Sequence, residues 1–83
     1  MDIPELVREL LILKLRLKDG ADMSIHINKS TISVQMWIGN SERWLRTMNL
    51  CDWLTKSSDF LSECWGIARD YNLLDKQEFL PFQ

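Results

Sequence analysis

Apolar and polar residues alternate along two consecutive segments of the chain, residues 23–28 and 31–38. A period of two that is rich in β-branched side chains is typical of half-buried strands. A turn at Lys29-Ser30 would align the apolar positions of the two segments on one face. The expected pairs are Ile27 with Ile32, Ile25 with Val34, and Met23 with Met36. Because a slip of one residue would move all of them to the other face, this register predicts an antiparallel hairpin with one buried side.

A second turn at Gly39-Asn40-Ser41 is expected to lead into a third strand over residues 43–48. With a loop over residues 39–42, Trp44 would lie opposite Trp37 and Arg46 opposite Gln35. Leu45 would then face the core opposite Met36. The two tryptophans are therefore expected to form a cross-strand pair on the polar side of the sheet.

The helical spacing of apolar residues predicts a first helix over about residues 4–18. Pro4 suits the first helical position, and Glu5 in the first turn suits the helix dipole. Asp19-Gly20 is expected to end the helix, with Gly20 in the left-handed conformation. The expected core face consists of Ile3, Leu6, Val7, Leu10, Leu11, Leu13 and Leu17.

A second helix is predicted over about residues 50–71, with Asn49 as its N-cap. Ser57-Ser58 could start a new helix, which would break this one near its middle. Its expected core face consists of Trp53, Leu54, Phe60, Leu61, Cys64, Trp65, Ala68 and Tyr71. The remaining tail, residues 73–83, contains Phe79-Leu80-Pro81-Phe82 and is expected to wrap around the domain because it is too apolar to remain in water.

These patterns predict one α+β domain over residues 1–83: a helix, a three-stranded antiparallel meander and a long second helix, with both helices on one sheet face. This element order resembles that of double-stranded RNA-binding domains, whose last helix begins with a lysine-rich, phosphate-binding stretch. The matching stretch here, residues 49–54, has an Asp and no Lys. The resemblance in order therefore does not imply RNA binding.

Composition narrows the function classes further. The 83 residues carry a net charge of −2, whereas a generic nucleic-acid binder is strongly basic. Two cysteines 13 residues apart, Cys51 and Cys64, predict a reducing cytoplasmic setting without a disulfide. No apolar run is long enough for a membrane span. We expect no metal or other cofactor, since the two Cys and the single His lie far apart in the sequence and the three Gly form no phosphate loop.

Catalysis is also not expected. His26 lies among Ser24 and Ser33, but nothing in the sequence specifies the orienting carboxylate that a Ser–His pair needs, so a surface histidine is favoured. Cys51 falls in the first turn of the second helix, where a thiol can be activated. Without a neighbouring His or Cys, it is interpreted as a packed or bystander thiol.

The main candidate contact residues are Trp37, Trp44, Arg46 and Gln35, because large aromatics beside an Arg are typical of binding hot spots. The alternative is that the Phe79–Phe82 tail covers the tryptophans. A second candidate surface is an acidic stripe opposite the apolar face of the second helix, formed by Asp52, Asp59, Glu63 and Asp70. It could meet a basic partner, or it could be a solvated helix face. A possible homodimer patch consists of Ile12, Leu15 and Arg8 on the outer side of the first helix.

The sequence therefore favours a non-enzymatic protein–protein interaction module. The chain is compact and begins with Met. We expect a stand-alone accessory protein of the kind common in phages and mobile elements, which binds and blocks or adapts a host protein in the host cytoplasm. The alternative hypothesis is nucleic-acid binding through the sheet face. Trp37 and Trp44 would then stack on bases, while Arg46 and Lys29 would hold phosphate.

Overall fold

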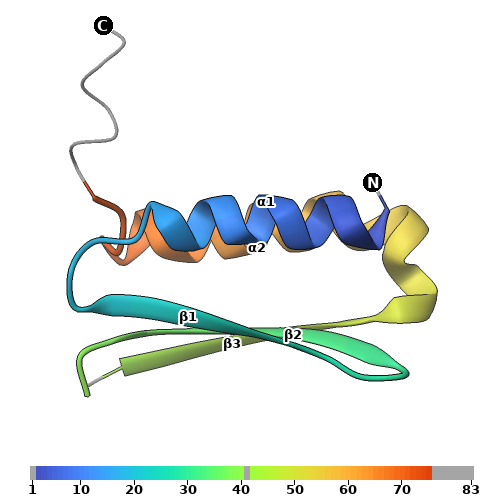
Figure 1. The fold of residues 1–83 in the computed structure, drawn as a ribbon, viewed down its shortest axis with the longest axis horizontal. Helices are drawn as coiled ribbons and strands as arrows, with labels where there is room; N and C mark the ends of the chain where they lie inside the picture. Colours follow the sequence, from blue (N-terminus) through green and yellow to red (C-terminus); the bar gives the residue numbers. More distant parts are fainter. Residues whose placement is uncertain (1, 41, 76–83) are drawn as a thin grey trace, which may run out of the picture.

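The computed structural model describes residues 2–40 and 42–75. The elements in chain order are α1 (Ile3–Leu15), β1 (Ala21–Ile27), β2 (Thr31–Ile38), β3 (Glu42–Asn49), the short 3-10 helix η1 (Leu50–Asp52) and α2 (Trp53–Asp70). The strands form one antiparallel sheet in the order β1-β2-β3. Both helices lie on the same side of this sheet (Figure 1). The predicted α+β fold is confirmed, while the Phe79–Phe82 segment lies outside the described residues.

Helix α1 begins at a capping box. The Asp2 Oδ1 accepts from the Glu5 backbone N–H at 2.8 Å, and the Glu5 Oε1 accepts from the Asp2 N–H at 3.3 Å. The helix ends at Leu15, three residues earlier than predicted. The segment after it pairs with the C-terminal part of the described chain instead, because the Lys18 N–H donates to the Leu73 carbonyl at 2.8 Å. This pairing accounts for the early end of α1.

Gly20 does adopt a positive φ of 90°, but it does not end the helix as predicted. It lies immediately before β1, and its carbonyl accepts from the Gly39 N–H at 2.8 Å. The left-handed conformation, which a Cβ disfavours, therefore turns the chain into the sheet.

The predicted register between β1 and β2 is confirmed. Ile27 lies opposite Ile32, and the two further apolar pairs follow as expected. The connection is fixed by Asn28, whose Oδ1 accepts from the Ser30 and Thr31 backbone N–H groups at 2.8 Å each. A short polar side chain bonded to its own turn is a frequent way to close such a connection.

The predicted register between β2 and β3 is wrong by one residue. Ile38 pairs with Glu42, so the connection holds three residues rather than four, and Trp44 lies opposite Met36. Because side chains alternate between faces, this shift places Trp44 on the helix-covered face and Leu45 on the opposite face. The predicted Trp37/Trp44 pair therefore does not form.

Helix α2 runs without a break through Ser57-Ser58, contrary to the interruption considered above. Ser57 is buried against the core and does not start a new helix. At the other end, Asn72 has a φ of 60°, and the Leu73 N–H donates to the Ala68 carbonyl at 2.8 Å. These features form a Schellman motif, which brings the fully buried Leu73 into the core.

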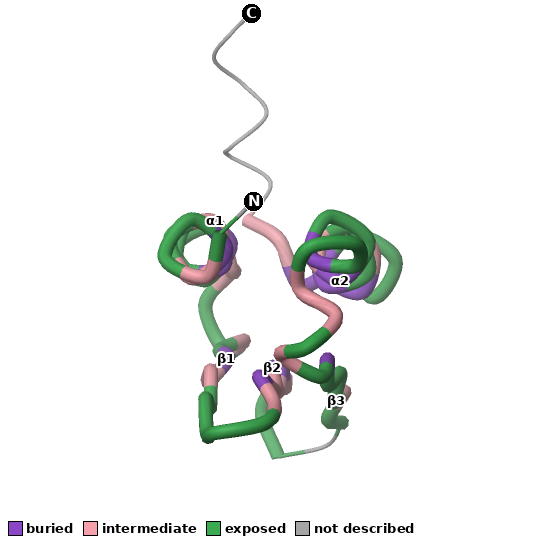
Figure 2. Tube along the Cα trace, turned by 90° about the vertical axis from the view of Figure 1, so that its right-hand side faces the viewer, coloured by how far each residue is buried: buried purple, intermediate pink, exposed green. Residues whose placement is uncertain are grey.

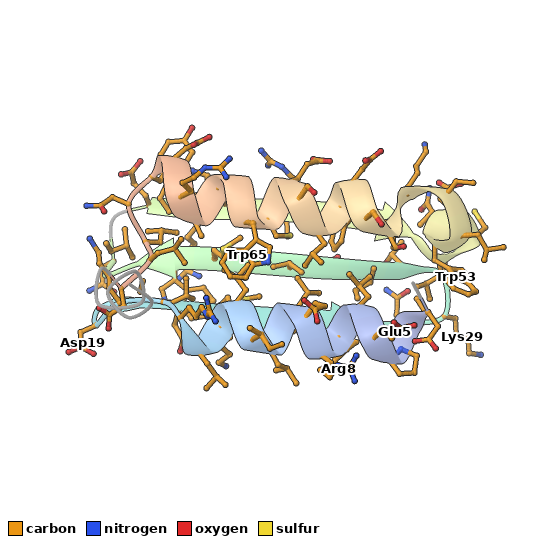
Figure 3. All side chains as sticks on the ribbon, turned by 90° about the horizontal axis from the view of Figure 1, so that it is seen from above. Glu5, Arg8, Asp19, Lys29, Trp53 and Trp65 are labelled. Atoms are coloured by element: carbon orange, nitrogen blue, oxygen red, sulfur yellow. The ribbon has the colours of Figure 1, made fainter. Side chains whose placement is uncertain are left out.

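The core lies between the helix pair and the sheet, so the domain has two layers (Figure 2). It contains apolar residues of α1, all three strands, α2 and the segment after it: Leu6, Leu10, Leu13, Met23, Ile32, Val34, Met36, Met48, Phe60, Cys64, Ile67, Ala68 and Leu73. Five residues predicted for the core are instead exposed, namely Leu11, Ile27, Leu45, Leu54 and Tyr71. Trp65 lies between the two helices and is half-buried (Figure 3).

Candidate functional site

The face of the sheet that points away from both helices is uncovered in the described structure (Figure 2). We call it the open face. By the strand registers it carries Asp22, Ser24, His26, Thr31, Ser33, Gln35, Trp37, Arg43, Leu45, Thr47 and Asn49. Besides His26, its ionisable side chains are Asp22 on β1 and Arg43 on β3.

Trp37 is the largest side chain on the open face and lies on the central strand β2. Its cross-strand neighbour on β3 is Arg43, whose guanidinium carbon lies 5.4 Å from the ring centroid. An Arg at this distance is attracted by the quadrupole of the indole, which restricts both side chains. The pair forms a half-buried aromatic platform with a cation attached to it.

Leu45 adds an aliphatic surface beside this platform. It lies opposite Gln35 and two residues after Arg43 on the same strand, which makes it a diagonal neighbour of Trp37. Its side chain is 59% exposed, although leucine is among the residues most often buried. Trp37 and Leu45 are therefore the apolar part of an otherwise polar face, and Arg43 lies beside both of them.

The remainder of the open face carries hydroxyl and amide groups. The Ser33 and Thr47 hydroxyls form a hydrogen bond between β2 and β3 at 3.1 Å. On β1, the Ser24 hydroxyl and the His26 Nε2 lie 3.2 Å apart. Among the described residues no carboxylate forms a hydrogen bond with His26, so this contact lacks the third member of a catalytic triad.

The structure separates the four predicted contact residues into two groups. Trp37 and Gln35 lie on the open face, whereas Trp44 and Arg46 lie on the helix-covered face. The Trp44 ring packs against Tyr71, with centroids 4.8 Å apart. Arg46 reaches α2, where its Nε lies 3.6 Å from the Glu63 Oε1. Trp44 and Arg46 therefore connect β3 to α2 and its C-terminal end.

The predicted register placed the open-face residues of β3, Arg43 and Leu45 among them, on the opposite face. The signal was present in the spacing of Trp44 and Met48, which are four residues apart and therefore share a face of any strand. Facing both toward the core buries two large apolar side chains, whereas the predicted register buried Leu45 instead. Counting the buried apolar residues would have selected the observed register.

The acidic stripe was predicted to lie opposite the buried face of α2, but it lies at one side of that face. Asp59 and Glu63, together with Asp52 from η1, line a groove between α2 and β3 of about 330 Å³. Ser57 and Ile67 belong to the buried face of α2, although the prediction did not include them. With them, the centre of the buried face lies closer around the helix to the acidic residues, so the stripe is at the side of this face. Asp70 is not part of the groove and pairs with its neighbour Arg69 at 3.6 Å.

The proposed dimer patch lies on the solvent side of α1. Leu15 is 83% exposed and Ile12 is 36% exposed, and Leu11 joins them at 47%. Arg8 is also exposed and points away from α2 (Figure 3). These residues form a short apolar ridge that the described chain does not cover.

The two cysteines differ in environment. Cys51 is exposed in η1, whereas Cys64 is fully buried in α2, and both are free thiols. Burial, with a smaller contribution from the Glu63 carboxylate, raises the pKa of the Cys64 thiol from 9.0 to about 12, against the opposing effect of Arg46. Cys64 is therefore a protonated core residue at neutral pH.

Within residues 2–40 and 42–75 no three His, Cys, Asp or Glu side chains are grouped so that they could hold a metal ion. The helices of this same part are too short or too polar to cross a bilayer. Comparison of the chain with protein-family models, with curated proteins and with solved structures found no match.

Proposed function

We propose that this protein is a non-enzymatic protein-binding module whose contact surface is the open face, centred on Trp37, Arg43 and Leu45. The observation that carries the proposal is the position of Trp37. A tryptophan beside an arginine on the central strand of an uncovered sheet face combines the residue types that dominate binding energies at protein interfaces. The surrounding hydroxyl and amide groups supply the polar rim that such interfaces have.

The charge balance of the open face supports a protein partner over a nucleic acid. A nucleic-acid surface needs several cations to neutralise phosphates. Here the registers place one arginine, Arg43, on the open face, and it lies over the Trp37 ring. Arg46, which the alternative hypothesis required for phosphate binding, lies on the other face beside Glu63. The nucleic-acid hypothesis also required a second stacking tryptophan, and Trp44 packs on Tyr71 instead.

We further propose that the module acts in a reducing cytoplasm, where it blocks or adapts a surface of its partner. Two free thiols in a chain of this size support that compartment. A sheet face centred on one tryptophan suits occlusion of a partner surface.

The test is affinity capture from cells that naturally contain the protein, followed by purification of the captured polypeptide and measurement of its Kd by calorimetry. Trp37→Ala and Leu45→Ala should each weaken binding about 30-fold or more, since hot-spot residues contribute about 2 kcal/mol or more. The matched control is Leu54→Ala, because Leu54 is an equally apolar, 74% exposed residue on the helix layer. Equal binding by all three variants and the wild type would contradict the proposal.

A further inference from the structure

Within the described residues both outer strands of the sheet have a free edge, since β1 and β3 each pair with β2 and with no other strand there. Along an antiparallel strand, alternate residues direct their N–H and C=O groups toward the neighbouring strand, and the others direct them away. The Asn28 N–H bonds to the Thr31 carbonyl and the Gly39 N–H to the Gly20 carbonyl, so the even-numbered residues of β1 face β2. The odd-numbered residues, Met23 among them, therefore present their backbone groups at the free edge.

The same argument identifies the free edge of β3. The Leu50 N–H bonds to the Ser30 carbonyl at 2.8 Å, and in this register the even-numbered residues of β3 face β2. The backbone groups of Arg43, Leu45 and Thr47 consequently point outward. A row of outward N–H and C=O groups is a template on which a strand of another chain can pair.

At the β1 edge, a carboxylate covers one of these groups. The Asp22 Oδ1 accepts from the outward N–H of Met23 at 2.8 Å, and the same oxygen lies 3.6 Å from the Nζ of Lys14 on α1. We call Lys14, Asp22 and Met23 the β1 edge cluster. The ion pair connects the helix above β1 to the edge of the sheet.

At the β3 edge, the Arg46 guanidinium covers a backbone carbonyl, just as the Asp22 carboxylate covers a backbone N–H at the β1 edge. The Arg46 Nη1 donates to the outward carbonyl of Leu45 at 2.9 Å, and the Arg46 Nε lies 3.6 Å from the Oε1 of Glu63 on α2. We call Glu63, Arg46 and Leu45 the β3 edge cluster. Arg46 is moreover a charged residue on the helix-covered face of an edge strand, which is a known means of preventing strand addition.

We propose that the two edge clusters block strand addition at both edges of this sheet, and that their loss allows a second copy of the chain to pair along the opened edge. An incoming strand would have to displace the hydrogen bond to Met23 or Leu45, and it would leave Asp22 or Arg46 without that backbone partner. Strand addition is one of the main ways in which sheet proteins recognise other chains. With both edges blocked, association is confined to the open face and the helix layer.

The test compares the mass of the wild type with that of Arg46→Ala and Asp22→Ala by sedimentation velocity over a wide range of concentration. Each variant should associate at concentrations at which the wild type does not gain mass. The matched controls are Arg43→Ala, an arginine of β3 that bonds no edge group, and Ser24→Ala on β1. Both controls should follow the wild type. Asp22 is exposed, so Asp22→Ala keeps the test valid even where Arg46→Ala lowers the stability of the fold.

Amide hydrogen exchange locates the new contact. In Arg46→Ala the N–H groups of Leu45 and Thr47 should exchange more slowly as the concentration rises, and in Asp22→Ala those of Met23 and Ile25 should do so. Masses equal to that of the wild type for both variants would overturn the proposal. Association with slowed exchange on α1 instead of the strand edges would also overturn it.

Discussion

Replacement of Trp44 by Ala distinguishes the observed register of β3 from the predicted one, in which Trp44 lies opposite Trp37. Trp44 is half-buried between the sheet and α2, and its ring contacts Tyr71 at 4.8 Å. Trp37 is also half-buried, but it lies on the open face, where its described aromatic-face contact is with Arg43. The two substitutions remove the same side chain from opposite faces of the sheet, so their effects on the free energy of unfolding should differ.

The magnitudes follow from the contacts. Truncation of a fully buried Trp costs about 3–5 kcal/mol, so a half-buried one should cost about 2 kcal/mol. The lost aromatic contact with Tyr71 adds roughly 0.5–1 kcal/mol. Trp44→Ala should therefore lower the free energy of unfolding by about 2–3 kcal/mol. Trp37 does not pack against the core, so Trp37→Ala opens no cavity there. It loses cross-strand contacts and the cation–π contact with Arg43 and should cost about 1 kcal/mol or less. A domain of this length has a total stability of about 4–12 kcal/mol.

Urea unfolding followed by far-ultraviolet circular dichroism measures both effects. With an m value of about 1 kcal/mol/M for so small a domain, Trp44→Ala should lower the midpoint by about 2–3 M and Trp37→Ala by about 1 M or less. The control is Leu45→Ala, which changes the exposed neighbour of Trp44. A larger loss for Trp37→Ala than for Trp44→Ala would refute the assignment of the two faces.

Two further predictions concern other elements. Cys64 should resist iodoacetamide in the native protein while Cys51 reacts. Because the folded pKa of Cys64 is raised to about 12, its contribution to stability is fully present below pH 9.0 and is lost as the pH rises from 9.0 toward about 12. The urea midpoint of the wild type should fall as the pH rises over this interval, and that of Cys64→Ala should fall less steeply. Equal falls for the two proteins would contradict a raised pKa of Cys64. Asn28→Ala removes two backbone hydrogen bonds in an exposed turn and should cost about 1 kcal/mol, seen as a fall in Tm of roughly 4–8 °C, and an unchanged Tm would count against this role.

The fold could be predicted where the residue type at each position favours one face of a strand or one position at a helix end. In β1 and β2 every second residue is apolar, so a single register places all of them on the helix-covered face, and that register is observed. The start of α1 followed from Pro4 and Glu5, and the end of α2 at Asp70 lies within one residue of the predicted end. Local chemistry was sufficient at these positions.

The candidate site could be predicted only in part, because each face of β3 carries both apolar and polar side chains. Trp44 and Leu45 are adjacent and both apolar, so the alternation does not choose between them, and the choice depended on the length of a loop. The observed register also places Arg46 on the helix-covered face, where Glu63 compensates its charge. A contact between residues 17 positions apart in the sequence cannot be read from local alternation. Trp37 was identified because β2 has no such ambiguity.

The central claim, that the open face is the binding surface, is tested most directly by mapping the contact in solution. Backbone and side-chain NMR signals would be recorded while the purified partner from the capture experiment is added. The claim predicts that the largest shifts occur at the Trp37 indole N–H, the Leu45 methyls and the amides of Ser33 and Thr47. Shifts confined to the α1 ridge of Leu11, Ile12 and Leu15, with the open face unchanged, would contradict it.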